Sequence, residues 1–265
     1  MSRLRRSLHK FYEKAEAILV PGLTSSQYGY YKVLRRLVSG KTWLDLGCGH
    51  QVFADWMVKE QAEVLGRCRT VFGIDLDWIG LRTHPGISNK TFGDLTALPF
   101  ADGTMELVTA NMVAEHLEDP AAVLREAYRV LAPGGAFVFH TPNFRGWVIQ
   151  IASRIPEALK KRLIWFLERR CAEDVFLTHY RLNTPDQIMT AAAKTGFAVE
   201  EIQMISSSAA TVMLGPVVLV ELLYIRALQS PKRSRLRSNI VAVLRKKIGQ
   251  KVAAPDMLEM ILRCR

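Results

Sequence analysis

The chain has 265 residues, 49% of them hydrophobic and 23% charged, which is the composition of a globular protein that buries a full core. This excludes a chain too polar to fold and leaves room for one large domain, or for one domain with an appendage. The net charge of +11 is uneven, since residues 1–41 carry +7 and residues 226–265 carry +9, which leaves −5 for the middle. Such basic flanks indicate either a polyanionic partner, nucleic acid or anionic lipid, or solvated helix faces without a partner.

The N-terminal residues and the cysteines indicate the cellular compartment that we expect for the protein. We expect no secretory segment, because Arg3, Arg5 and Arg6 interrupt the first helical pattern. The cysteines show neither CxxC pairing nor metal-ligand spacing, so we expect free thiols in a reducing cytoplasm and no metal site. The four are Cys48, Cys68, Cys171 and Cys264.

Residues 1–41 form a basic helical segment, with helices predicted over 3–19 and 25–39. From residue 42 to 143, strands alternate with helices and are joined by short turns, which predicts an α/β fold: a Rossmann-like, doubly wound and mainly parallel sheet with helices on both faces. The predicted strands are 42–46, 70–75, 90–93, 105–111 and 136–140, and the helices between them are 52–65, 77–83 and 120–132.

Two segments follow this core. Residues 144–183 show a helical pattern without a strand signal, and we interpret them as a helical lid over the ligand edge of the sheet. Residues 184–208 complete the core sheet: Thr184 and Gln187 form a capping box that begins a helix, and a strand is predicted from Phe197 to Ile205.

The last segment, 209–265, is predicted to be helical, apolar at first and basic afterwards. Residues 209–220 carry no charge, but they are too few to span a membrane, which needs about 20. With the basic tail they could form an interfacial element, which would place a cytoplasmic protein on the cytoplasmic face of a membrane. A buried core helix is the alternative, and the sequence leaves both open.

The stretch from Asp45 to Gln51 indicates a cofactor site. An apolar run ends in Asp45, Gly47 and Gly49 follow, and a helical pattern begins at once. Glycine lets a ligand approach the backbone closely, and a helix N-terminus offers unpaired N–H groups to an anionic group. Dinucleotide-binding domains use similar turns, so this loop alone does not identify the cofactor.

Further motifs follow in order. Asp75 and Asp94 end the second and third strands, where carboxylates can accept hydrogen bonds from a ribose and from an adenine amine. Then come Leu98-Pro99-Phe100, Glu115-His116-Leu117 and Arg129-Val130-Leu131 with Pro133-Gly134-Gly135. This ordered set resembles the class I S-adenosylmethionine-dependent methyltransferases, in the branch that acts on small molecules and lipids. The resemblance covers residues 40–143, with a weaker similarity at 184–205.

The resemblance implies cofactor-binding roles for eight residues. Four would lie near the methionine portion of S-adenosylmethionine, and four near its ribose and adenine. The first four are Asp45, Gly47, Gly49 and Asn111, and the second four are Asp75, Leu76, Asp94 and Leu95. The family usually has a third glycine in the first loop where this chain has Gln51, a departure that favours a methyltransferase over a nicotinamide dehydrogenase.

Two histidines are candidate catalytic bases. Histidine has an ordinary pKa near neutrality, which suits proton removal from a hydroxyl or amine acceptor. His116 follows the fourth strand and His140 ends the fifth. For His116 the alternative is a hydrogen bond to the backbone of a loop.

The acceptor is expected to be a small hydrophobic or lipid-linked molecule, O-methylated near an anionic membrane surface. Basic ends and an apolar run suit such a surface. Nucleic acid is a less favoured partner, because Asn111 is followed by Met112-Val113 and not by the Pro-Pro-aromatic element that holds a flipped base. An RNA methyltransferase and a non-catalytic scaffold that binds the cofactor remain alternatives.

Overall fold

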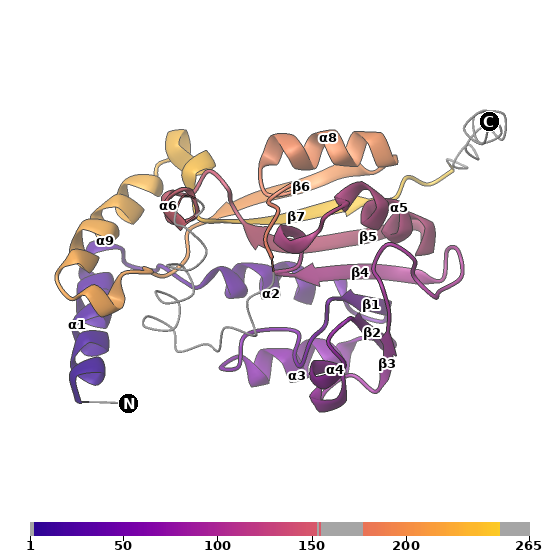
Figure 1. Ribbon diagram of the computed structural model, residues 1–265, viewed down its shortest axis with the longest axis horizontal. Coiled ribbons are helices and arrows are strands. Elements are labelled where there is room, and N and C mark those ends of the chain that lie inside the picture. Colours follow the sequence, from indigo (N-terminus) through magenta and orange to yellow (C-terminus); the bar gives the residue numbers. More distant parts are fainter. Residues whose placement is uncertain (1–2, 153, 155–176, 250–265) are drawn as a thin grey trace.

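One sheet of seven strands organises the computed structural model, which describes residues 3–152, 154 and 177–249 (Figure 1). The strand order is β3-β2-β1-β4-β5-β7-β6, and β1 to β5 are parallel. The bounds are β1 Thr42–Leu46, β2 Thr70–Asp75, β3 Asn89–Phe92, β4 Met105–Asn111, β5 Leu131–Pro142, β6 Ala198–Ile205 and β7 Asn239–Arg245. The predicted doubly wound α/β fold is confirmed.

Helices cover both faces of the sheet, because its strands are apolar on both sides. Leu44 and Val108 pack with α5 and α8 on one face, while Trp43 and Leu107 pack with α2, α3 and α4 on the other. The bounds are α2 Ser26–Leu37, α3 Val58–Arg67, α4 Trp78–Thr83, α5 Pro120–Val130 and α8 Pro185–Thr195. The predicted capping box at the start of α8 forms in part. Gln187 N donates to Thr184 Oγ1 at 3.2 Å, while Gln187 Oε1 accepts from Asn183 N, one residue before the N-cap, at 2.9 Å.

The C-terminal segment departs from its prediction. The helical interpretation of 209–265 is wrong at Asn239–Arg245, which forms β7 between β5 and β6 and is antiparallel to both. The physical reason is the uncharged run Ile240–Leu244, which is rich in β-branched residues and is fully buried in the sheet. Its basic neighbours hid it within a segment interpreted as a charged tail.

Two other predictions concern the start of the helix after the first loop and the lid over 144–183. The helix expected to begin at 52 begins at Val58, because Val52, Phe53 and Met57 are buried as a loop against the sheet. The expected lid over 144–183 falls largely outside the described residues, within which α6 spans Trp147–Ala152 and 177–183 form no regular element.

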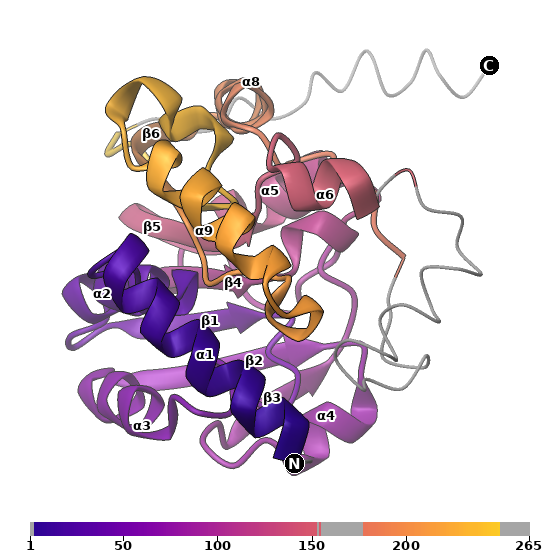
Figure 2. The same cartoon turned by 90° about the vertical axis from the view of Figure 1, so that its left-hand side faces the viewer.

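Two helices lie beside each other (Figure 2), at the left-hand end of the molecule in Figure 1. They are α1 Arg3–Leu19 and α9 Val217–Leu228, and they share a separate apolar cluster that includes Tyr12, Val218 and Leu222. The short 3₁₀-helices η3 Val212–Leu214 and η4 Pro231–Leu236 flank α9. No helix in the described part of the chain is both long enough and apolar enough to cross a bilayer.

Candidate functional site

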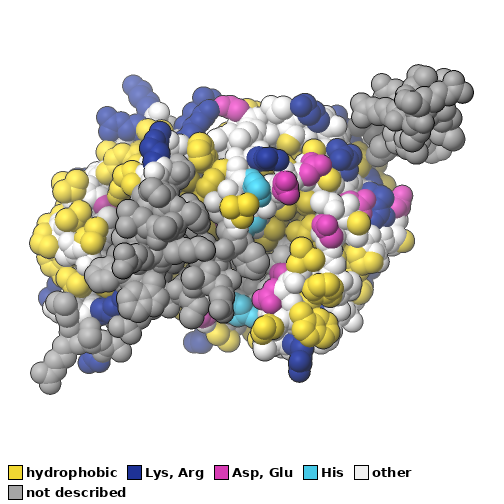
Figure 3. Space-filling model, viewed as in Figure 1, with side chains coloured by type: hydrophobic (Ala, Val, Ile, Leu, Met, Phe, Trp, Pro, Cys, Tyr) yellow, Lys and Arg dark blue, Asp and Glu magenta, His cyan; other side chains and the backbone are white. Residues whose placement is uncertain are grey.

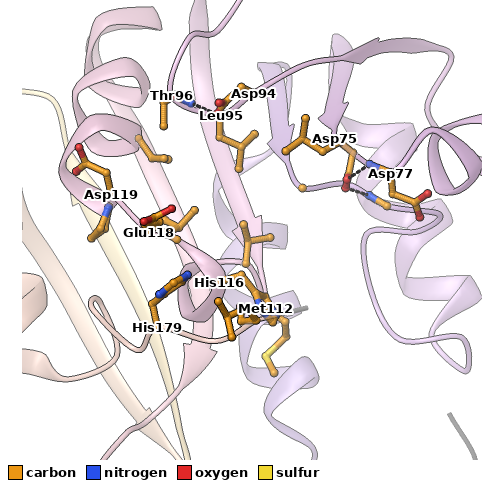
Figure 4. A pocket seen from close by; sticks show the side chains of 18 of the residues that line it. Asp75, Asp77, Asp94, Leu95, Thr96, Met112, His116, Glu118, Asp119 and His179 are labelled. Carbon is orange, nitrogen blue, oxygen red and sulfur yellow. Dashed lines mark hydrogen bonds between the residues drawn. The ribbon is translucent and has the colours of Figure 1, made fainter. Parts of the chain in front are cut away.

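A cavity of about 1410 Å³ opens where β1, β2, β3 and β4 end. Ligands of open parallel sheets bind at this carboxyl edge. Figure 4 shows Asp75 and Asp77 on one side of the cavity and Glu118 and Asp119 on the other. Seven of the ten predicted site residues line it: Gly47, Gly49, Asp75, Leu76, Asp94, Leu95 and His116.

The first loop has the backbone shape that its glycines permit. Gly47 and Gly49 have φ angles of +63° and +49°, in the left-handed region that glycine adopts without strain. A Cβ at Gly47 would lie 2.5 Å from Val113 Cγ2, so the close approach also excludes a side chain there. The loop therefore presents bare backbone to the cavity.

The Asp75 carboxylate is fixed by two backbone donors. Gly49 N donates to Oδ2 and Asp77 N donates to Oδ1, both at 2.7 Å. Each carboxylate oxygen can accept a second hydrogen bond, so the group remains able to bind hydroxyls of a ligand. The carboxylate thus joins the first loop to the end of β2 and faces the cavity.

Asp94 and Leu95 line the cavity beyond the end of β3. Asp94 Oδ1 accepts from Thr96 N at 2.8 Å, which is the local turn that aspartate commonly forms. Leu76, from the turn after β2, is 61% exposed although it is apolar. Leu76 lies in the same cavity as the carboxylates of Asp75 and Asp94. This combination can bind a ligand that has an apolar face for the leucine and hydrogen-bond donors for the carboxylates.

His116 lies at the end of η1 Ala114–His116, directly after β4. Its Nδ1 is 2.9 Å from Leu177 O. A carbonyl oxygen can only accept, so Nδ1 carries the proton and the neutral ring has its lone pair on Nε2. The predicted alternative, a hydrogen bond to loop backbone, is therefore present, and it sets the tautomer without removing His116 from the cavity.

Glu115 holds the wall behind His116. Its side chain is buried, Thr141 Oγ1 donates to Oε2 at 3.1 Å, and Oε1 is 4.0 Å from His116 Nε2. Burial raises the pKa of the Glu115 carboxyl, while the nearby His116 opposes that shift. The backbone N–H groups of His179 and Tyr180 donate to Glu115 O at 2.7 and 3.2 Å, which ties the returning chain to η1.

The remaining three predicted residues lie beneath the cavity and not in its lining. Asp45 is 2% exposed and accepts from Thr109 Oγ1 at 2.5 Å, and Thr109 accepts from Trp43 Nε1 at 2.7 Å. Burial raises the pKa of Asp45 to about 7, although the hydrogen bond from Thr109 opposes this. Asp45 therefore belongs to a buried network under the first loop.

The half-buried Asn111 and the buried His140 form a second hydrogen-bonded network. Asn111 Nδ2 donates to Val52 O at 2.7 Å and to Gln27 Oε1 at 3.0 Å, and its Oδ1 accepts from His140 Nδ1 at 2.8 Å. The His140 ring is 1% exposed and stacks on Tyr30 with 5.7 Å between centroids. Burial lowers the pKa of His140 to about 4, so its ring is neutral and enclosed.

Several lining residues were not singled out as site residues from the sequence. Met112 has a φ angle of +58°, an unusual value for a residue other than glycine and one associated with functional sites. Arg181 Nη1 donates to Glu118 O at 2.5 Å and brings a cation to the cavity. For Leu177 and Arg181 the sequence signal was the segment 144–183, interpreted as a lid over this edge, and for the others it was a position near a strand end or motif. These lining residues are Trp56, Asp77, Met112, Glu118, Asp119, Leu177 and Arg181.

Comparison with known proteins agrees with this geometry. A family model described as a methyltransferase domain matches residues 27–202, more than half of the chain. A probable S-adenosylmethionine-dependent methyltransferase of Mycolicibacterium smegmatis is 33% identical over 134 residues, which cover 47% of this chain and 49% of that protein. A ubiquinone biosynthesis O-methyltransferase of Pseudomonas paraeruginosa is 32% identical over 114 residues, covering 40% and 46%. The chain thus spans about half the length of these relatives.

A solved structure shows the same fold. The S-adenosylmethionine-dependent methyltransferase from Mesorhizobium loti has a TM-score of 0.53 and 21% identity, covering 83% of this chain and 98% of that one. The family match over residues 27–202 includes all four strands whose ends line the cavity. We conclude that the chain belongs to the class I S-adenosylmethionine-dependent methyltransferases, whose cofactor is S-adenosylmethionine.

Proposed function

We propose that the protein transfers a methyl group to the oxygen of a small hydrophobic or lipid-linked acceptor at a membrane surface. The observation that carries the proposal is the apolar character of the cavity around His116. Three side chains there are exposed although they are apolar: Trp56 at 56%, Met112 at 38% and Leu177 at 70%. Exposed apolar side chains grouped in one cavity favour an apolar ligand.

The cofactor would bind in the part of the cavity between the first loop and the ends of β2 and β3. The bare backbone at Gly47 and Gly49 would admit the methionine portion, and the Asp75 carboxylate would accept from both ribose hydroxyls. Leu76 and Leu95 would pack on the adenine, with Asp94 at its amine edge. Asp45 and Asn111 would act from beneath, by supporting the loop, because neither lines the cavity.

His116 is the proposed general base. When bound, S-adenosylmethionine supplies a methyl group on a positively charged sulfur, which is an excellent leaving group. The acceptor oxygen would form the new bond to the methyl carbon, and the electron pair of the broken carbon–sulfur bond would remain on sulfur. His116 Nε2 takes the hydroxyl proton, and the buried Glu115 carboxyl, 4.0 Å away, stabilises the resulting imidazolium. His140 is not proposed as a base, because its ring is enclosed.

The name of the Pseudomonas paraeruginosa relative, an O-methyltransferase of ubiquinone biosynthesis, supports a phenolic acceptor of low polarity. The test is methyl transfer from S-adenosylmethionine labelled in its methyl group to phenols with alkyl chains of increasing length. Matched anilines, RNA and a sample without acceptor serve as controls. We expect label on the phenol oxygen, with kcat/KM rising with chain length. Label on RNA or on anilines alone would contradict O-methylation, and bound cofactor without transfer to any acceptor would indicate a scaffold.

A further inference from the structure

We propose that α9 and η4 form the surface by which this protein docks on an anionic phospholipid bilayer. The surface consists of an outward apolar stripe, Leu214, Val217, Val220 and Leu223, and a basic rim, Arg226, Lys232 and Arg233. Below, these two sets are called the stripe and the rim. The proposal rests on the proposed function only in that a lipid-like acceptor would be found at such a surface.

The stripe is unusual because α9 has apolar residues on both of its faces. Val218, Leu222 and Ile225 face inward and pack with α1. On the opposite side Val217, Val220 and Leu223 are 51%, 70% and 53% exposed. Figure 3 shows hydrophobic side chains gathered over this end of the molecule, with Lys and Arg side chains beside them. A surface helix normally turns charged residues to water, so this face calls for a partner of low polarity.

The rim lies directly against the stripe. A hollow of about 550 Å³ is lined by Leu223 of the stripe together with all three rim cations, which places apolar and cationic groups within one surface feature. Within the described part of the chain, no acidic side chain pairs with the rim. A phosphate group bonded to an acyl chain matches this combination, because the cations can bind the phosphate while the chain continues over the stripe.

The docking surface carries no exposed acidic side chain of residues 202–249. Glu221 is the only acidic residue among 202–249, against eight cations. Its side chain is buried, and it accepts from Ala210 N at 3.0 Å and from Thr211 N at 2.8 Å. The single carboxylate of α9 is thus turned inward and holds the chain that enters η3. Nothing acidic on α9 opposes approach to an anionic bilayer.

The rim is also held in place by the body of the protein. Arg237, directly after η4, donates to the carbonyl oxygens of Leu228, Gln229 and Met204, each at 3.0 Å. Asn143 Nδ2 donates to Arg235 O at 3.0 Å. Because η4 is fastened in this way, its cations are positioned before binding, and less conformational entropy is lost when a bilayer orders them.

An anionic bilayer is favoured over nucleic acid. The stripe consists of aliphatic residues, whereas surfaces for single-stranded nucleic acid use aromatic side chains on which bases stack. The only aromatic residue of α9 is Tyr224, which is half-buried against Trp147 of α6 with 6.3 Å between the ring centroids. A bilayer uses both parts of the surface, because its lipid tails receive the stripe and its phosphates bind the rim.

The test is co-flotation of the full-length protein with vesicles of phosphatidylcholine alone or with about one third phosphatidylglycerol, without cofactor or acceptor. We expect binding that requires the anionic lipid and weakens with salt. In the variant Arg226→Gln/Lys232→Gln/Arg233→Gln, affinity should fall about 100-fold, at about fivefold per cation. The control is Lys59→Gln/Arg125→Gln/Lys194→Gln, which removes the same charge from exposed positions elsewhere and should bind as the wild type does.

A second variant, Val220→Ser/Leu223→Ser, tests the stripe and should weaken binding at high salt, where the apolar contribution dominates. Equal losses in the rim variant and its control, or unchanged binding in both the rim and stripe variants, would overturn the proposal. Stronger binding of the rim surface to RNA than to anionic vesicles would also overturn it. Methyl transfer to a short, water-soluble phenol is measured on the same samples. Loss of docking with transfer intact, or the reverse, shows which of the two proposals fails.

Discussion

The carboxyl edge of the sheet has two layers that differ in what they can do. The pocket wall, Asp75, Asp94 and His116, is open to the cavity, and its polar groups retain capacity to bind a ligand. The buried layer, Asp45 and His140 with its hydrogen-bond partner Asn111, lies beneath and is engaged with other protein groups. Both layers carry carboxylate and histidine side chains near strand ends, so the roles proposed for them, binding and chemistry or support, follow from exposure and not from residue type.

The largest effect is expected at Asp75. Asp75→Ala removes the proposed ribose acceptor and also the partner of Gly49 N and Asp77 N. With several hydrogen bonds to a charged group lost, cofactor affinity should fall at least ~10³-fold in calorimetry. Asp55→Ala is the control, because Asp55 is exposed and also lines the cavity, and this variant should bind the cofactor as the wild type does. Unchanged affinity in Asp75→Ala would remove Asp75 from the pocket wall as a binding group.

The next largest effect is expected at His116. His116→Gln retains a polar side chain but no base, so turnover should fall ~10²–10⁴-fold while cofactor affinity stays within error. His50→Gln, a second histidine that lines the cavity but lies on the first loop, is the matched control and should keep most of its activity. Turnover of His116→Gln at the wild-type level would contradict the role of a general base and would show that methyl transfer needs only positioning of the acceptor.

A third prediction concerns the negative charge that Glu115 places beside His116. Glu115→Gln keeps an acceptor for Thr141 and leaves the backbone bonds to His179 and Tyr180 intact, so the fold should be preserved. Loss of the negative charge near the imidazolium should lower kcat about tenfold with little change in the KM of the acceptor, and it should alter the pH profile of kcat. A change in KM alone would point to a purely structural role.

The sequence predicted most of the fold and of the pocket wall, because those features depend on local patterns. Asp75 ends β2 and His116 follows β4, two strands with clear apolar runs, and parallel strands bring their ends together. The strand before Asp94, β3, has no apolar run and was predicted from the Gly93-Asp94 turn that closes it. The sequence could not separate His116 from His140, since burial depends on α2, which contributes Tyr30 from far along the chain. It also missed β7, because the short apolar run Ile240–Leu244 lies among basic residues and was interpreted together with them as part of a charged helical tail.

His140 should affect stability and not chemistry. His140→Phe keeps a ring against Tyr30 but removes the hydrogen bond that His140 donates to Asn111 Oδ1, which then accepts only from Gln27 Nε2 at 3.3 Å. The loss of this one hydrogen bond should cost about 0.5–1.5 kcal/mol in the free energy of unfolding. Turnover should remain within about threefold of the wild type, because His116 is unchanged. The measurement is urea denaturation together with the methyl-transfer assay. A loss of turnover as large as that of His116→Gln would contradict a purely structural role for His140.

The buried layer should also show opposite pH responses in its two titrating groups. Between pH 6.5 and about 4 the unfolded chain protonates His140 while the fold keeps it neutral, so His140 lowers stability as the pH falls. Between about pH 4 and 7 the fold keeps Asp45 protonated after the unfolded chain has released its proton, so Asp45 lowers stability as the pH rises. In denaturation measured from pH 4 to 7, the deficit of His140→Phe relative to the wild type should therefore shrink toward pH 4. The stability of Asp45→Asn relative to the wild type should increase toward pH 7, and parallel curves for all three proteins would contradict a buried layer with shifted pKa values.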